Sequence, residues 1–146
     1  MGNLKIWIGG VLVLAFAYLF FHDVLVKNPT DVSRKFNLMK SDSDYMLGMG
    51  GDVVFRKDLD RGSSASITRG VSADSWSDQL FEKYRVALQG RGWKVRQHAD
   101  HEKWEACKLG VLATLDMKPE FFPALSANTY GIRFEYSASS IRECGP

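Results

Sequence analysis

The stretch SWSDQLFEKYRVALQGRGW, Ser75 to Trp93, decides the fold. Its apolar residues recur every four positions and predict one buried helix face: Trp76, Leu80, Tyr84 and Leu88, with Phe81 widening the stripe. Ser75 and Asp78 form a start that resembles a capping box, and Gly90 and Gly92 suit the C-terminal cap. We therefore expect one main amphipathic helix here.

Strand patterns lie on both sides of this helix. Before it, GDVVFRKDL (51–59) predicts a strand with Val53 and Phe55 on one face, and SASITRGV (64–71) a weaker one. After it, WKVRQH (93–98) alternates, and WEACKLGVLATLDM (104–117) is expected to be one long strand with Gly110 as a bulge.

The last strand pattern, TYGIRFEYSAS (129–139), shows the clearest alternation. Large apolar residues occupy every second position, and small or charged residues lie between them. Such a strand buries one face and exposes the other to water. The fold class we predict is α+β: a small antiparallel sheet with one main helix packed on one face.

The order Tyr84, Leu88, Gly92, Trp93, followed by an antiparallel hairpin, resembles small membrane-anchored envelope domains of bacteria. The resemblance covers the helix and the hairpin, and its residues are packing residues. It implies a fold and an envelope address, with no activity or site residue to carry over.

An apolar segment at the N-terminus, IWIGGVLVLAFAYLFF (6–21), carries no charged residue. As a helix it would be about 24 Å long, and the flanking residues extend it to a bilayer span. We expect residues 1–26 to be a transmembrane helix that stays attached. The alternative is a signal peptide, because Ala15 to Ala17 mimic a cleavage site.

The orientation of this anchor is ambiguous in the sequence. Positive residues follow the segment more than they precede it, which favours a cytoplasmic domain. The very short N-terminal tail and the cysteines favour an extracytoplasmic domain, periplasmic in a bacterium. We expect a polar connector at 27–45, which Pro29 separates from the anchor, and one α+β domain at 46–146.

Composition excludes some classes of partner. The formal net charge is only +2, so the chain lacks the basic surplus of nucleic-acid-binding proteins. The partners we expect are the lipid bilayer and another envelope protein.

Two cysteines, Cys107 and Cys144, allow a single disulfide. If the long strand pairs with the last one so that Met117 opposes Thr129, Cys107 faces Ser139, and the tail can fold back to bring Cys144 within reach. The alternative is a buried Cys107 beside a free thiol in the tail.

Candidate sites are few, and no catalytic motif or cofactor-binding motif is present. His98, Asp100 and His101 are weak metal-ligand candidates without a second ligand cluster; a polar turn is the other interpretation. The residues we expect to contact a partner are the cations and aromatics Arg85, Arg91, Lys94, Arg96, Phe121 and Phe122. The alternative for the cations is a solvated face that complements the helix dipole, and for the two phenylalanines it is a lid packed under the sheet.

From these observations we expect a non-enzymatic single-pass membrane protein whose small extracytoplasmic domain is an interaction or accessory module. The alternative function is binding of a lipid headgroup or of a small cell-wall ligand.

Overall fold

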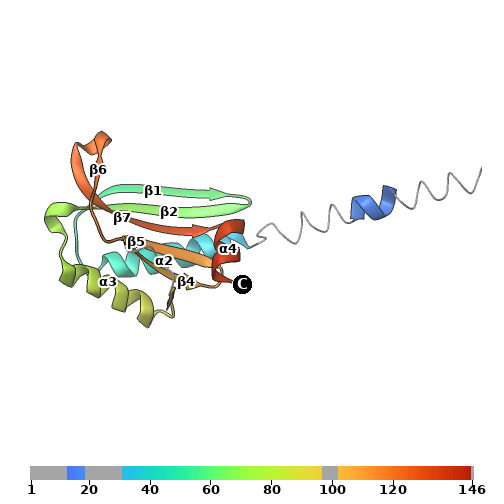
Figure 1. The fold of residues 1–146 in the computed structure, drawn as a ribbon, viewed down its shortest axis with the longest axis horizontal. Helices are drawn as coiled ribbons and strands as arrows, with labels where there is room; N and C mark the ends of the chain where they lie inside the picture. The colour runs from blue at the N-terminus through green and yellow to red at the C-terminus, as the bar shows by residue number, and fades with distance from the viewer. Residues whose placement is uncertain (1–12, 19–30, 97–101, 146) are drawn as a thin grey trace, which may run out of the picture.

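The computed structural model describes residues 13–18, 31–96 and 102–145, and it has an α+β fold (Figure 1). Strands β1 (Val53–Arg61), β2 (Ser64–Ser72), β3 (Lys94–Val95), β4 (Lys103–Lys108), β5 (Val111–Asp116), β6 (Glu120–Phe122) and β7 (Ala127–Tyr136) form one sheet. Its order is β1-β2-β7-β5-β4-β3, β6 pairs with β7, and every pairing is antiparallel.

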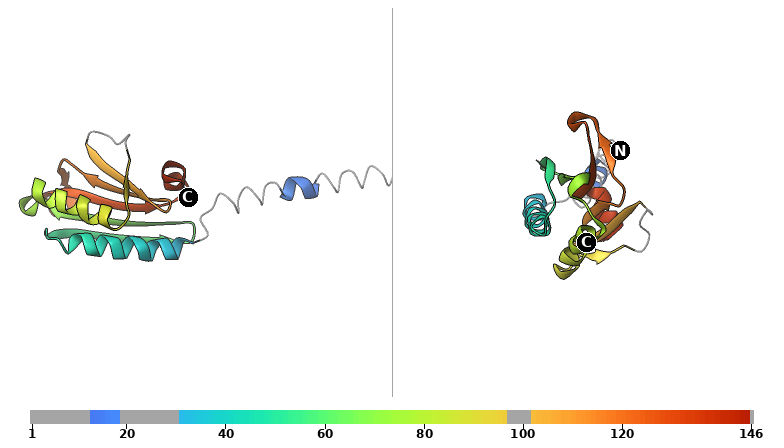
Figure 2. Two further views of the ribbon diagram at one scale, coloured as in Figure 1. Left: turned by 90° about the horizontal axis from the view of Figure 1, so that it is seen from below. Right: turned by 90° about the vertical axis from the view of Figure 1, so that its left-hand side faces the viewer.

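Two helices cover one face of this sheet, α2 (Val32–Leu47) and α3 (Asp78–Gly90). Ile67, Phe134 and Leu115 point from the sheet into one core cluster with Met39 of α2 and Tyr84 of α3, all of them fully buried. Figure 2 shows the helical layer on this side of the strands. Among the residues that the structure describes, no helix of comparable length covers the opposite side. The sheet therefore has one covered and one open face.

Helix α2 corrects the expected connector at 27–45, because residues 32–47 are helical and belong to the domain. The helix buries Val32, Met39 and Met46 against the sheet. The same face also buries Asp42 and Ser43, and these polar residues made the stretch look like a linker. The sheet therefore carries two main helices where one was expected.

Helix α3 lies where the four-residue repeat predicted it. Its N-cap is Ser77, whose side chain accepts a hydrogen bond from the Leu80 amide, so the expected cap at Ser75 is wrong. Ser75 ends a short 3-10 helix (Ala73–Ser75), and its hydroxyl accepts a hydrogen bond from the Asp52 amide. Gly92 follows the helix with a φ of +87°, as expected of a C-terminal glycine.

The expected long strand at 104–117 is two strands, β4 and β5, joined by a tight turn. Leu109 and Gly110 both have positive φ (51° and 78°), as a two-residue hairpin turn requires. Gly110 is thus a turn residue and not a bulge, and Cys107 pairs with Leu112 and Lys94, not with Ser139. The segment between β5 and β7 contains β6 and a second 3-10 helix (Pro123–Leu125).

Helix α4 (Ala138–Cys144) closes the end of the sheet beside the β4–β5 turn. Ser137 and Ser140 form a reciprocal capping box at its start. The buried Ser140 hydroxyl donates to the Gly110 carbonyl, and a disulfide joins Cys107 of β4 to Cys144, with the two Cα atoms 5.4 Å apart. The C-terminal helix is therefore tied to the sheet by covalent and hydrogen bonds.

The expected membrane anchor at 1–26 lies outside the described residues except for 13–18, which are helical. Within the ranges 13–18, 31–96 and 102–145, no helix combines the length and the apolar character that crossing a membrane requires.

Candidate functional site

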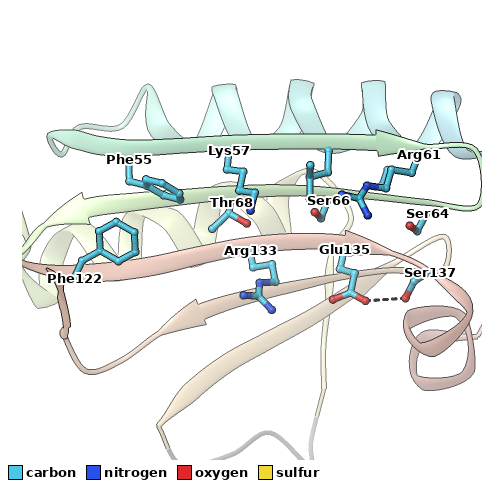
Figure 3. Close-up of a pocket in the computed structure, with 12 residues that line it drawn as sticks. Phe55, Lys57, Arg61, Ser64, Ser66, Thr68, Phe122, Arg133, Glu135 and Ser137 are labelled. Carbon is cyan, nitrogen blue, oxygen red and sulfur yellow. Dashed lines mark hydrogen bonds between the residues drawn. The ribbon is translucent and has the colours of Figure 1, made fainter. Parts of the chain in front are cut away.

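The open face of the sheet forms a trough with a volume of about 560 Å³ between β1, β2, β7 and the end of β6 (Figure 3). The strand register aligns the residues that line it in rows across β1, β2 and β7. Lys57, Thr68 and Arg133 lie directly opposite one another on β1, β2 and β7, and Leu59, Ser66 and Glu135 form the next row. All six side chains leave the sheet on the side away from α2 and α3.

A β-bulge at the start of β1 places an aromatic ring in this trough. The register shifts between Val53, which pairs with Val71, and Phe55, which pairs with Gly70. Val53 therefore packs against the core while Phe55 lies on the open face, so the expectation that both share one face is wrong. The extra residue of a bulge is what reorients the side chains that follow it.

Phe55 meets Phe122, the last residue of β6, at the same end of the trough. Their ring centroids are 4.9 Å apart and the ring planes are tilted by 51°. Beneath them, Gly70 of β2 is directly opposite Gly131 of β7. A Cβ on Gly70 would lie 3.1 Å from the Phe55 Cβ, so glycine permits this close approach. Gly131 is also closely covered, because a Cβ there would clash with Oδ2 of Asp116.

The charge of the trough is predominantly positive. Lys57, Arg61 and Arg133 line it, and none of them forms a hydrogen bond or ion pair with another described residue. The carboxylate in the lining, Glu135, accepts a hydrogen bond from the Ser137 hydroxyl at 2.7 Å, drawn in Figure 3. The cations are thus available to an external anion.

A second hollow of about 270 Å³ continues across β7 and β5 and is more acidic. Its lining includes Glu105, Asp116 and Glu120. Burial raises the pKa of Asp116, and the neighbouring Glu120 charge raises it further. Lys103, the Gly131 amide and the charge of Arg133 act in the opposite direction. The open face is therefore positive over β1 and around Arg133 of β7, and acidic toward β4.

On the covered face, a buried carboxylate joins the helices to the sheet. Asp42 of α2 has no exposed surface and forms an ion pair with Arg91. It also accepts hydrogen bonds from Trp93 Nε1 and Lys108 Nζ, each at 2.8 Å. Burial acts to raise the pKa of Asp42, but the three donors outweigh it and the pKa is lowered. This network is structural, because the carboxylate at its centre is fully buried and joins α2 to residues that follow α3 and end β4.

The four cations expected to bind a partner are not gathered into an unpaired patch. Arg85 pairs with Glu82, Arg91 with Asp42, and Arg96 with both Glu105 and Glu143. Lys94 lies exposed on the edge strand β3. Most of their charge is already balanced within the domain.

The expected aromatic residues separate onto different surfaces. Phe121 has 63% of its surface exposed, whereas Phe122 packs on Phe55 in the trough. Of the metal-ligand candidates, His98, Asp100 and His101 all lie outside the described residues. In the described part of the chain, no three side chains of the metal-binding types come together.

Another hollow, of about 660 Å³, lies on the helical side between α2 and α3. Its apolar residues, Tyr45, Met49 and Val86, are partly exposed, and Lys83 stands at its rim. It offers an apolar contact surface, but without the row of unpaired cations found on the open face.

Sequence reasoning missed the trough residues Lys57, Arg61 and Arg133. The alternation of β7 predicted that Arg133 lies on the solvent-exposed face of the strand, and this was the signal in the sequence that pointed toward the trough. The alignment of Lys57 with Arg133 follows only from strand register. Comparison with protein families, curated proteins and solved structures gives no match for this chain.

Proposed function

We propose that this chain is a non-enzymatic, single-pass membrane protein whose extracytoplasmic domain is an interaction module, with the open face of the sheet as its binding surface. The observation that carries the proposal is the trough, in which three cations without a partner among the described residues stand beside an aromatic pair. Desolvating an unpaired charge is costly, so such residues on a hollowed face favour a partner that supplies the opposite charge.

The disulfide supports the extracytoplasmic address. Disulfides persist in oxidising compartments and are rare in the cytosol. An anchor at residues 1–26 would hold the domain beside a membrane partner and raise its effective concentration there. Finding Cys107 and Cys144 as free thiols, in protein trapped by acid quenching of the producing cells and then alkylated, would contradict this address.

Photocrosslinking tests the binding surface. A benzoylphenylalanine replaces Leu59, which lines the trough, or Val86, which is 64% exposed on the outer side of α3. We expect adducts from position 59 and none from position 86 in cells irradiated with the full chain in place. Adducts from position 86 alone would assign the interaction to the helical side.

The alternative function, binding of a lipid headgroup or small cell-wall ligand, is favoured by a specific observation. The trough volume of about 560 Å³ falls within the range of small-molecule sites. In this version the ligand is a small molecule and the domain is its receptor or carrier.

A further inference from the structure

The trough separates a cationic row from an aromatic end. Adjacent strands are about 5 Å apart, so the Cα atoms of Lys57 and Arg133 are about 10 Å apart across Thr68. Both side chains are long enough to reach a common point above the Thr68 hydroxyl. Phe55 is two residues from Lys57 along β1, which is about 7 Å.

From this arrangement we infer that the trough binds an amphiphilic organic anion, a small molecule with one acidic group and one flat apolar or aromatic part. The acidic group lies between Lys57 and Arg133, and the apolar part lies against Phe55 and Phe122. This inference rests on the alternative function proposed above, small-ligand binding by the open face, because it names the ligand class of that surface.

The two ends of the trough fit the two parts of such a molecule. Lys57 and Arg133 repel one another across Thr68, and neither forms an ion pair or hydrogen bond with a described residue, although the charge of Arg133 also acts on Asp116. An anion between the two cations relieves their repulsion. At the other end, the tilted rings of Phe55 and Phe122 offer an aromatic surface that a flat apolar group can contact. Arg61, near the far end of β1, adds positive potential without touching the ligand.

The β-bulge at Val54 is independent support. The register shift between Val53 and Phe55 leaves Val53 on the core side of β1 and puts Phe55, together with Lys57, on the open side. Bulges that reorient a side chain occur preferentially next to functional sites. Here the reoriented side chain is the one that completes the aromatic end of the trough.

A matched pair of probes tests the inference. Naphthalene-2-sulfonate is an aromatic anion, and naphthalene-2-sulfonamide has the same shape without the charge. Each is titrated into the ¹⁵N-labelled full chain in phosphatidylcholine nanodiscs, with empty nanodiscs as the blank. We expect the sulfonate to shift amide signals of β1, β2 and β7 and to bind about tenfold more tightly than the sulfonamide, because a charge-assisted contact is worth about that factor.

Neighbouring residues on opposite faces supply the control variants. Lys57→Gln and Arg133→Gln should each weaken sulfonate binding about five- to tenfold and leave sulfonamide binding unchanged. Arg56→Gln makes the same change of charge on the other face of β1 and should alter neither. Phe122→Leu should weaken both probes, whereas the exposed Phe121→Leu should weaken neither.

The outcomes distinguish this inference from the proposed function. Equal affinity for the two probes, with shifts on β1, β2 and β7, would overturn the anionic ligand and leave the open face as a binding surface. If neither probe binds but crosslinks from position 59 depend on Lys57, the trough takes an acidic protein surface instead and the inference fails. Shifts confined to α2 and α3 would count against both.

Discussion

Asp42 is the residue on which the covered side of the domain depends. Its carboxylate comes from α2, and its partners are Arg91 and Trp93, just after α3, and Lys108 at the end of β4. These segments are far apart in the sequence, so one side chain fixes the positions of two helices and a hairpin. A carboxylate without exposed surface is tolerated only because all its partners are present.

Asp42→Asn should lower the free energy of unfolding by about 3 kcal/mol, because it leaves two cations without their buried partner. Asp44→Asn is the matched control. Asp44 is half-exposed on the same helix and is 3.7 Å from Lys40, so its replacement should change stability by less than about 0.5 kcal/mol. Urea denaturation measures both; equal effects would contradict the structural role of Asp42.

The free energy of unfolding should also depend on pH through Asp42. Burial acts to raise the pKa of Asp42, but its three donors lower it below the usual 3.8 in the folded protein. The stability that the charged form contributes is therefore complete above pH 3.8 and is lost as the pH falls through the lower folded value. Below pH 3.8, the free energy of unfolding should therefore fall less steeply with pH in Asp42→Asn than in the wild-type protein. Part of the fall should remain in the variant, because Arg69 also lowers the pKa of Asp58.

Among the elements, α3 and β7 were predictable and α2 was not. The Leu80–Tyr84–Leu88 repeat and the alternation of β7 are local patterns, and local patterns are visible in one sequence. Helix α2 has a sparse apolar stripe, interrupted by Asp42, and its burial depends on Arg91 and Lys108, which no local window contains. The β4–β5 turn was missed because Gly110 also suits a bulge.

The candidate site was predictable only in part, for the same reason. The pattern of β7 placed Arg133 on the solvent side, but the bulge at Val54 has no signature in the sequence and reverses the side on which Phe55 lies. Arg85 and Arg96 were predicted to contact a partner because they lie in a cationic stretch of the sequence. In the fold, each of them forms an ion pair with a carboxylate.

Helix α4 depends on its covalent link to β4. Cys107 and Cys144 are separated by 37 residues, and a loop of that length predicts a disulfide contribution of about 3–4 kcal/mol. Cys144→Ser should lose this amount in urea denaturation under oxidising conditions. Reductant should destabilise the wild-type protein similarly and leave the variant unchanged; a loss below about 1 kcal/mol would show that α4 contributes little to closing the sheet.

For the whole molecule, the decisive feature is the difference between the two sides of one sheet. One side carries α2, α3 and the core, and its buried charges, Asp42 and Arg69, are paired. The other is hollowed, and its cations Lys57, Arg61 and Arg133 lack partners among the described residues. With a net charge of only +2, the chain gains its positive trough from arrangement and not from composition.

The most direct test of this account compares Lys57→Gln with Arg56→Gln in the full chain carrying benzoylphenylalanine at position 59. Both variants lose one positive charge on β1, but only Lys57 lines the trough. The account predicts that the yield of the crosslinked product falls severalfold in Lys57→Gln and stays unchanged in Arg56→Gln. Equal yields in the two variants would contradict it.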